Sequence, residues 1–129
     1  MERSKYGARK TVVDGITFDS KKEATRYREL KLLEDAGEIE KLQLQVPFEL
    51  VPALYEQTTE RYTKGPKKGE RKKGKCIERA VTYYADFVYY DLVNDTWVAE
   101  DVKGMRTKEY IIKRKLFRHL YYTHDFREV

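Results

Sequence analysis

Apolar residues gather most densely between Tyr83 and Gly104, and this segment is the centre of the predicted fold. Aromatic and β-branched residues make up most of positions 83–90 and are frequent at 96–102, a composition that favours β-strands. The stretch Val93-Asn94-Asp95 between them contains the Asn-Asp pair typical of a turn. The sequence therefore predicts a β-hairpin, and the other elements are expected to pack around it.

Charged residues interrupt this hairpin at only a few positions. Asp86 breaks the first strand, and the second strand ends in Asp101-Val102-Lys103. Because side chains alternate between the two faces of a strand, Asp101 and Lys103 share one face, while Glu100 and Val102 share the other. Pairing across the turn brings Asp86 near Asp101, and two half-buried carboxylates repel each other unless they share a proton or a cation. We therefore expect a divalent metal ion at this point.

Two helices are predicted, one on each side of the hairpin in the chain. The segment from Ser20 to Ala36 begins with a capping box, Ser20 at the N-cap and a glutamate three residues later, and Gly37 is expected to end it. Thr107 is expected to cap a second helix that reaches about Tyr122. The apolar arc predicted for this helix consists of Tyr110, Ile112, Leu116, Phe117, Leu120 and Tyr121.

Further strands complete the expected sheet. Residues 38–52 alternate apolar and polar side chains and contain Pro47, which indicates an edge strand or a bulge. Gln45 in this strand could approach the site, but an exposed strand glutamine is the preferred interpretation. The tail from residue 124 to residue 129 is expected to add a short last strand. These elements predict an α/β fold with a mixed central sheet flanked by helices, in a single domain over residues 1–129.

Two charged side chains on the helices have two interpretations each. Glu23 lies within the apolar arc of the first helix, so it either only caps the helix or points through that arc at the metal site. Lys113 lies near the centre of the arc on the second helix. It either snorkels or forms an i,i+4 pair with Glu109, or it reaches the edge of the sheet near the carboxylates.

The net charge of +5 conceals an uneven distribution. Between Arg61 and Arg79 there are nine Lys or Arg residues against two Glu, so this segment holds the entire basic excess. Its glycines and proline favour a flexible insertion at about residues 56–79, which is either a solvated loop or a mobile arm along a phosphate backbone. The basic residues expected to contact DNA are Lys64, Lys67, Lys68, Arg71, Lys72, Lys73 and Lys75, with Arg106 and Lys108 near the second helix.

Asp86 followed by Asp101-Val102-Lys103 resembles the core motif of the PD-(D/E)xK nuclease superfamily. The order of elements resembles that of small endonucleases encoded by phages and prophages, of the Holliday-junction-resolvase type. Ala85 stands where the motif has its proline. The resemblance covers about residues 15–55 and 80–122 and implies a restriction-endonuclease-like core, with the basic segment as an insertion.

This resemblance implies an Mg²⁺-dependent endonuclease, in which Mn²⁺ can substitute for Mg²⁺. Its substrate would be DNA from recombination or replication, including branched DNA such as Holliday junctions, and a homodimer would cut both strands. A non-catalytic nucleic-acid-binding module, with the same charges as a structural cluster, is the alternative. The implied catalytic residues are Glu23, Asp86, Asp101, Lys103 and Lys113, and the implied metal ligands are Glu23, Asp86, Asp101 and the carbonyl of Val102.

Other features point to a cytoplasmic protein without a membrane partner, located in the host cell if a phage encodes it. No apolar stretch has the length of a membrane span, and nothing after Met1 resembles a secretory signal. The lone Cys76 has no partner for a disulfide or a zinc site. His119 and His124 lack the spacing of a helical metal pair, so both are interpreted as structural.

Overall fold

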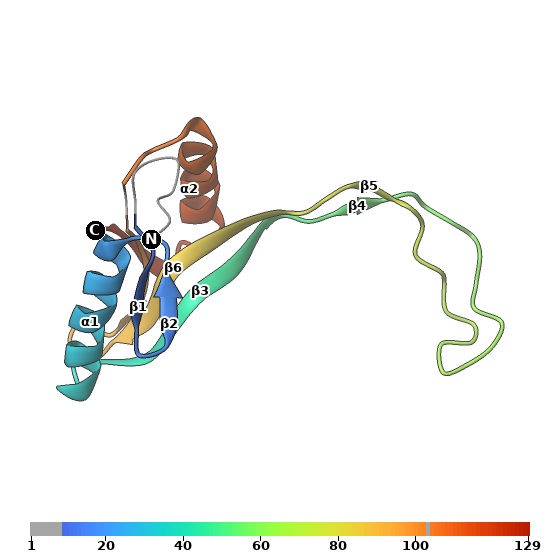
Figure 1. Cartoon of the computed structure of the whole chain (residues 1–129). Coiled ribbons are helices and arrows are strands. Elements are labelled where there is room, and N and C mark those ends of the chain that lie inside the picture. The colour runs from blue at the N-terminus through green and yellow to red at the C-terminus, as the bar shows by residue number, and fades with distance from the viewer. Residues whose placement is uncertain (1–8, 103) are drawn as a thin grey trace.

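The computed structural model describes residues 9–102 and 104–129 and consists of a three-layered body, helix, sheet and helix, and a long arm (Figure 1). The body is built on a mixed four-stranded sheet in the order β3-β6-β7-β8. A helix packs against each face of this sheet, as the sequence predicts. The elements of the body are β1 (Thr11–Val13), β2 (Ile16–Phe18), α1 (Lys21–Asp35), β3 (Ile39–Val51), β6 (Val81–Asp91), β7 (Thr96–Asp101), α2 (Lys108–Leu120) and β8 (His124–Glu128).

The central hairpin is formed by β6 and β7, with the turn where the sequence places it. Asp91 fixes the turn, because its Oδ1 accepts hydrogen bonds from the backbone N–H groups of Val93 and Asn94 at 3.0 Å. β3 pairs antiparallel with β6. β8 pairs parallel with β7, so α2 makes the crossover that a parallel connection requires. The expected last strand is therefore confirmed.

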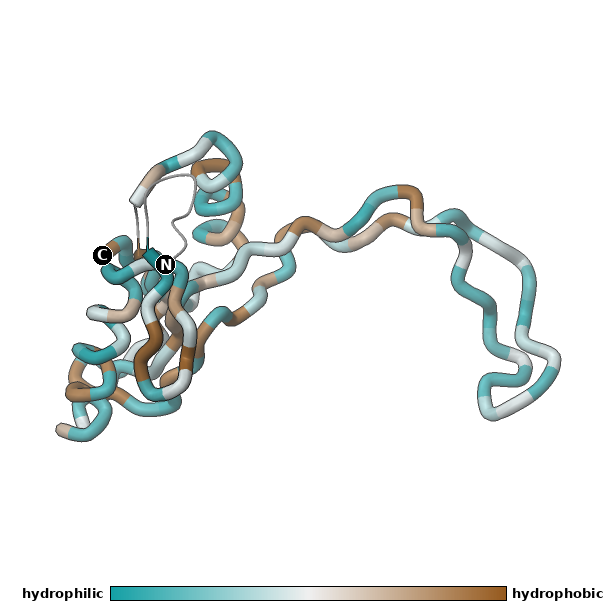
Figure 2. The backbone as a smooth tube through the Cα atoms, in the orientation of Figure 1, coloured by the Kyte–Doolittle hydropathy of each residue, from teal (hydrophilic) through white to brown (hydrophobic). Residues whose placement is uncertain are grey.

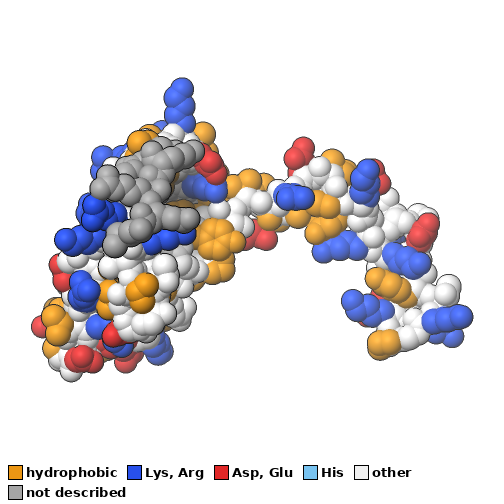
Figure 3. Space-filling model, in the orientation of Figure 1, with side chains coloured by type: hydrophobic (Ala, Val, Ile, Leu, Met, Phe, Trp, Pro, Cys, Tyr) orange, Lys and Arg blue, Asp and Glu red, His pale blue; other side chains and the backbone are white. Residues whose placement is uncertain are grey.

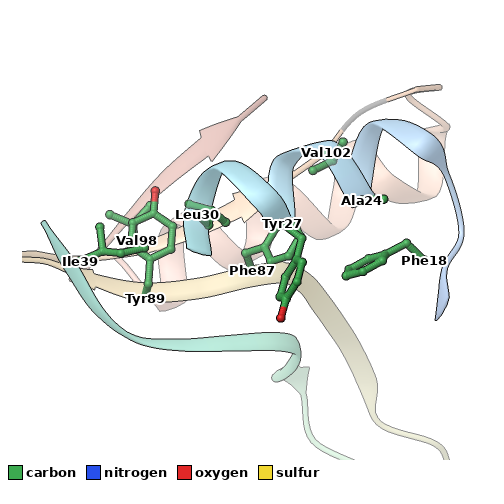
Figure 4. Close-up of a cluster of buried hydrophobic side chains, with 9 residues drawn as sticks. All are labelled: Phe18, Ala24, Tyr27, Leu30, Ile39, Phe87, Tyr89, Val98 and Val102. Carbon is green, nitrogen blue, oxygen red and sulfur yellow. The ribbon is translucent and has the colours of Figure 1, made fainter. Parts of the chain in front are cut away.

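Helix α1 begins where Ser20 caps it, since Ser20 Oγ accepts a hydrogen bond of 3.1 Å from the backbone N–H of Glu23. Its buried side chains Ala24, Tyr27 and Leu30 pack on one face of the sheet. Figure 4 shows this core, in which rings and aliphatic side chains from the helix, the sheet and β2 meet. The cluster consists of Phe18, Ala24, Tyr27, Leu30, Ile39, Phe87, Tyr89, Val98 and Val102.

A buried charge also joins α1 to the sheet. Glu100 of β7 is fully buried, and both of its carboxylate oxygens accept hydrogen bonds from the guanidinium of Arg26, at 2.7 and 2.6 Å. The hydroxyl of Tyr89 donates to the same carboxylate. A buried carboxylate needs such partners, because an unpaired buried charge is strongly destabilising. Glu100 therefore serves the α1 interface and faces away from Asp101, as strand alternation predicts.

Helix α2 covers the other face of the sheet. Thr107 caps it, with Oγ1 accepting from the backbone N–H of Tyr110 at 3.1 Å, and Phe117 is fully buried. The predicted apolar arc is wrong at two positions, since Ile112 is 59% exposed and Leu120 is 51% exposed. The buried stripe is centred on Tyr110 and Phe117, which are seven residues apart and so share one side of the helix. Ile112 lies across the helix from that stripe, and Leu120 is the last helical residue.

β3 is an edge strand of the sheet, which explains how Pro47 is accommodated without a backbone donor. A register irregularity between Glu40 and Gln43 interrupts its pairing with β6, so both predicted features, an edge position and a bulge, are present. β3 and β6 continue past the body into the arm.

The arm is an extended hairpin rather than an unstructured loop in the described residues (Figures 1 and 2). β4 (Leu54–Tyr55) pairs with β5 (Cys76–Glu78), and an isolated bridge joins Arg61 to Arg71 further out. Among the described residues, no helix is both long and apolar enough to cross a membrane.

Candidate active site at the fork between β6 and β7

The candidate site lies where β6 and β7 part. Their ladder ends at the pair Phe87 and Glu100, and the next position along each strand is Asp86 and Asp101. β7 ends at Asp101, whereas β6 continues towards the arm, paired with β3 alone. The two aspartates therefore stand opposite each other at a fork in the sheet, as the hairpin register predicts.

The fork also coincides with a change in side-chain alternation along β6. Phe87 and Tyr89 pack in the core under α1, whereas Tyr83 and Ala85, at the same two-residue spacing, pack in the core under α2. A regular strand would place all four on one face. Because the phase changes at Asp86, its side chain belongs to neither apolar core, and it is half-buried.

The same change occurs on β3, directly across from Asp86. Gln45 lies between the pairs Leu44–Phe87 and Val46–Ala85 and has a left-handed backbone with φ of 49°. Its side-chain Nε2 donates a hydrogen bond of 3.0 Å to Oδ1 of Asp86. Gln45 is exposed, as the preferred interpretation expects, and it also reaches the site, the alternative that the sequence left open, because its side chain holds Asp86.

Asp86 accepts a second hydrogen bond at its other oxygen. The backbone N–H of Val102 donates to Oδ2 at 2.8 Å, which ties the end of β7 to this carboxylate. Burial raises the pKa of Asp86 to about 6, the Val102 N–H lowers it, and the charge of Asp101 and a hydrogen bond with its carboxyl group raise it. Asp86 therefore holds a proton more tightly than an exposed aspartate does, chiefly because it is buried and also because Asp101 is its neighbour.

Asp101 is buried and is held from the α2 side of the sheet. The hydroxyl of Tyr83 donates a hydrogen bond of 2.6 Å to its Oδ2. Burial and the neighbouring Asp101 charge hold the pKa of Tyr83 far above its ordinary value, so the hydroxyl keeps its proton and remains a donor. Sequence reasoning gave no role to Tyr83, because the phase change that turns it towards Asp101 has no signal in the residue pattern.

Glu23 reaches the same place from the first turn of α1. It is half-buried and lines one pocket with Asp86 and Asp101. Burial raises the pKa of Glu23 to about 7, with further increases from the charges of Asp86, Asp19 and Asp101 and a decrease from a backbone hydrogen bond at Asp19. The two interpretations of Glu23 are thus compatible, because its backbone belongs to the cap while its carboxyl group faces the aspartates.

The pocket formed by these residues has a volume of about 320 Å³, at the lower end of small-ligand sites. Lys113 lines it from α2 and is half-buried, and its Nζ lies 3.0 Å from Oε1 of Glu109. Lys113 therefore has both the structural partner and the position near the carboxylates that the sequence left as alternatives. The pocket is lined by Glu23, Tyr83, Tyr84, Asp86, Asp101, Val102, Thr107, Glu109, Tyr110 and Lys113.

The other predicted site residues occupy different positions. Lys103 lies outside the described residues. Arg106 is exposed but bonded to Glu128, with Nη2 and Oε2 2.5 Å apart, while Lys108 is exposed in the first turn of α2. The predicted DNA contacts from Lys64 to Lys75 all lie in the arm, away from the pocket.

The donor set suits a hard divalent cation, since it consists of carboxylates with a backbone carbonyl nearby. In residues 9–102 and 104–129, however, no three His, Cys, Asp or Glu side chains are already grouped as a metal cluster. The pair Asp86 and Asp101 is the nucleus of the candidate metal site, and Glu23 faces it across the pocket. Because the pKa values of Glu23 and Asp86 are raised, cation binding at this site should compete with protons on these two groups.

A family model described as "Protein of unknown function (DUF1064)" matches residues 3–128. The chain belongs to the DUF1064 family. No curated protein and no solved structure matches it. The range matched by DUF1064 includes the arm as well as the sheet and both helices. Its description assigns no activity, so the nuclease hypothesis rests on the residues of the site.

Proposed function

We propose that this protein is a metal-dependent endonuclease that hydrolyses DNA phosphodiester bonds. The observation that carries the proposal is the meeting of three carboxylates from three elements, Glu23, Asp86 and Asp101, in one pocket at the fork of the sheet. Burial, with a further contribution from the neighbouring carboxylates, raises the pKa of Glu23 and of Asp86, and a bound cation would offset both effects.

In this proposal Asp86 and Asp101 would hold Mg²⁺, and Glu23 and the carbonyl of Val102 would be further ligands. Mn²⁺ would substitute, because it also accepts oxygen ligands. The ion, when bound, supplies Lewis acidity and lowers the pKa of coordinated water. Gln45 and the Val102 N–H orient Asp86, and Tyr83 orients Asp101.

The lysines supply positive charge to the substrate. Lys113 lines the pocket and is proposed to bind the scissile phosphate, exchanging its partner Glu109 for a phosphate oxygen. Lys103, two residues after Asp101 in the chain, is proposed to orient or deprotonate the attacking water. Removing either charge would slow cleavage, because the phosphate gains negative charge in the transition state.

Recombination or replication intermediates, including branched DNA such as Holliday junctions, are the proposed substrates. The resemblance to phage and prophage enzymes and the basic arm support this choice. Symmetric cutting of such a branch needs two active sites, which a homodimer would supply.

The test is cleavage of labelled four-way junction and linear duplex DNA in Mg²⁺, Mn²⁺ or EDTA. Asp101→Asn is the informative variant, because asparagine keeps an oxygen that can accept from Tyr83. Asp35→Ala, at the exposed end of α1, is the matched control. We expect metal-dependent cutting by the wild type and the control, and DNA binding without cutting by Asp101→Asn. If the wild type binds but never cuts, the protein is a non-catalytic binding module.

A further inference from the structure

The arm is a preformed ribbon with its own hydrogen bonds. The N–H of Glu56 donates to the carbonyl of Lys75 at 2.8 Å, and the N–H of Lys72 donates to the carbonyl of Glu60 at 2.8 Å. Closer to the tip, Tyr62 and Glu70 pair at 3.0 Å. The basic segment that the sequence predicts to be flexible therefore forms two strands joined by backbone hydrogen bonds almost to its tip.

This ribbon has no apolar core of its own. Its basic side chains are all exposed, and in residues 9–102 and 104–129 none of them forms an ion pair with a carboxylate. Figure 3 shows Lys and Arg side chains along the arm. A two-stranded ribbon without packing is marginal in water, and its uncompensated positive charge favours a polyanion as the partner that covers it.

Tyrosines hold several of the lysines in place. The ammonium of Lys73 lies 4.1 Å from the ring centroid of Tyr55. The ring of Tyr62 has Lys72 at 5.7 Å and Lys67 at 6.0 Å. Cation–π contacts fix lysine side chains that would otherwise be mobile, so less entropy is lost when they bind phosphates.

The arm is connected directly to the candidate active site. β6 carries Asp86, and its beginning at Val81 follows the arm without an intervening helix or domain. Tyr84 of the same strand is exposed and lines the pocket. At about 3.3 Å per residue, the chain from Asp86 back to Arg71 spans up to about 50 Å, more than the roughly 34–36 Å of one DNA helical turn.

We infer that the arm binds the phosphate backbone of duplex DNA more than one helical turn away from the candidate site at the fork of the sheet. The inference rests on the proposed DNA substrate, but not on cleavage. The outer contacts of the arm then depend on duplex length, because they form only when a duplex extends far enough from the site to reach them, up to about 15 base pairs. Short duplexes would bind through the body alone.

The first test measures binding in EDTA, so that no cleavage is involved, to duplexes of 8 and 30 base pairs over a salt series. The variant replaces Lys67, Lys68, Lys72 and Lys73 with glutamine. For the 30-base-pair duplex, we expect the slope of log K against log salt to fall by up to about 3.6, from about 0.9 per phosphate contact. The slope for the 8-base-pair duplex should stay unchanged. Equal slopes for wild type and variant on the long duplex would overturn the inference.

The second test separates an ordered ribbon from a flexible chain of charges. A Cβ at Gly74 would lie 2.0 Å from the carbonyl oxygen of Glu56, so Gly74→Ala must distort the pairing of the arm without altering its charge. Thr63→Ala, also exposed in the arm, is the control. We expect Gly74→Ala to lose much of the preference for the long duplex and Thr63→Ala to keep it. If Gly74→Ala kept the wild-type preference for the long duplex, the claim that binding depends on an ordered ribbon would be wrong.

The alternative binding partner of the arm is a second copy of this chain. If the glutamine variant changed the molecular mass in solution while DNA binding stayed the same, the arm would be a dimer contact and the inference would fail. If the arm effects appeared as expected but no substrate was ever cut, the inference would stand and the proposed nuclease activity would fail.

Discussion

Glu23→Gln should stabilise the metal-free protein at alkaline pH. The folded state raises the pKa of Glu23 from 4.5 to about 7, so the fold favours the neutral carboxyl group. The stability contributed by this group is complete below about pH 4.5 and is lost as the pH rises through 7, because the folded state binds the proton more tightly than the unfolded chain. Glutamine imitates the neutral form at every pH.

The magnitude follows from the shift and from two corrections. At about 1.4 kcal/mol per pKa unit, the full shift corresponds to about 3 kcal/mol, which screening of a half-exposed group reduces to about 1–2 kcal/mol. Losing a negative charge at the helix N-terminus costs about 0.5 kcal/mol. A net gain of about 1 kcal/mol should raise the Tm by about 3–6 °C at pH 8 in EDTA.

Thermal unfolding in EDTA at pH 8 and at pH 4.5 checks this expectation. The gain should be absent at pH 4.5, where the wild-type carboxyl group already carries its proton, and Mg²⁺ should stabilise the wild type more than Glu23→Gln. Glu38→Gln, at an exposed position beyond the other end of α1, should change the Tm little at either pH. A lower Tm for Glu23→Gln at pH 8 would refute the reasoning that the site holds repelling carboxylates.

Two further substitutions test the supports of the site and the fold. Gln45→Ala removes a hydrogen bond that lowers the pKa of Asp86, so the pKa of Asp86 should rise further. The affinity for Mn²⁺ at pH 7, measured by calorimetric titration, should fall about 10-fold. Equal affinities of the wild type and the variant would show that Gln45 has no role in the site. Arg26→Ala leaves the carboxylate of Glu100 buried without its ion pair and should reduce the free energy of unfolding by about 3–5 kcal/mol in denaturant titrations. A loss below about 1 kcal/mol would show that Glu100 is neutralised in another way.

Much of the fold could be predicted because its signals are local. The capping residues Ser20 and Thr107 mark both helix starts, and the hairpin register places Asp86 opposite Asp101. Pro47 marked the edge strand correctly. The apolar arc of α2 was placed incorrectly, since Ile112 is apolar but exposed. The sequence alone does not distinguish an exposed apolar residue from a buried one.

The supports of the site were not predictable from the residue pattern. Gln45 and Tyr83 reach the aspartates because the side-chain alternation of β3 and β6 changes phase at the fork. This change involves a left-handed backbone at Gln45, a conformation that is usually found at glycine and that a glutamine in the sequence does not indicate. The ribbon in the arm was also missed. Glycine, proline and charge favour a flexible loop, whereas the cross-strand hydrogen bonds join residues that are distant in sequence, such as Glu56 and Lys75.

The central claim is that Asp86 and Asp101 hold a divalent cation at the fork of the sheet. A crystal of the protein soaked in Mn²⁺, measured for anomalous scattering, tests it most directly. We predict a peak with oxygens of both aspartates about 2.0–2.6 Å away, the range of oxygen ligands to hard cations, and no such peak in Asp101→Asn. Well-ordered wild-type crystals with no peak at the fork, or with one whose ligands exclude both aspartates, would contradict the account.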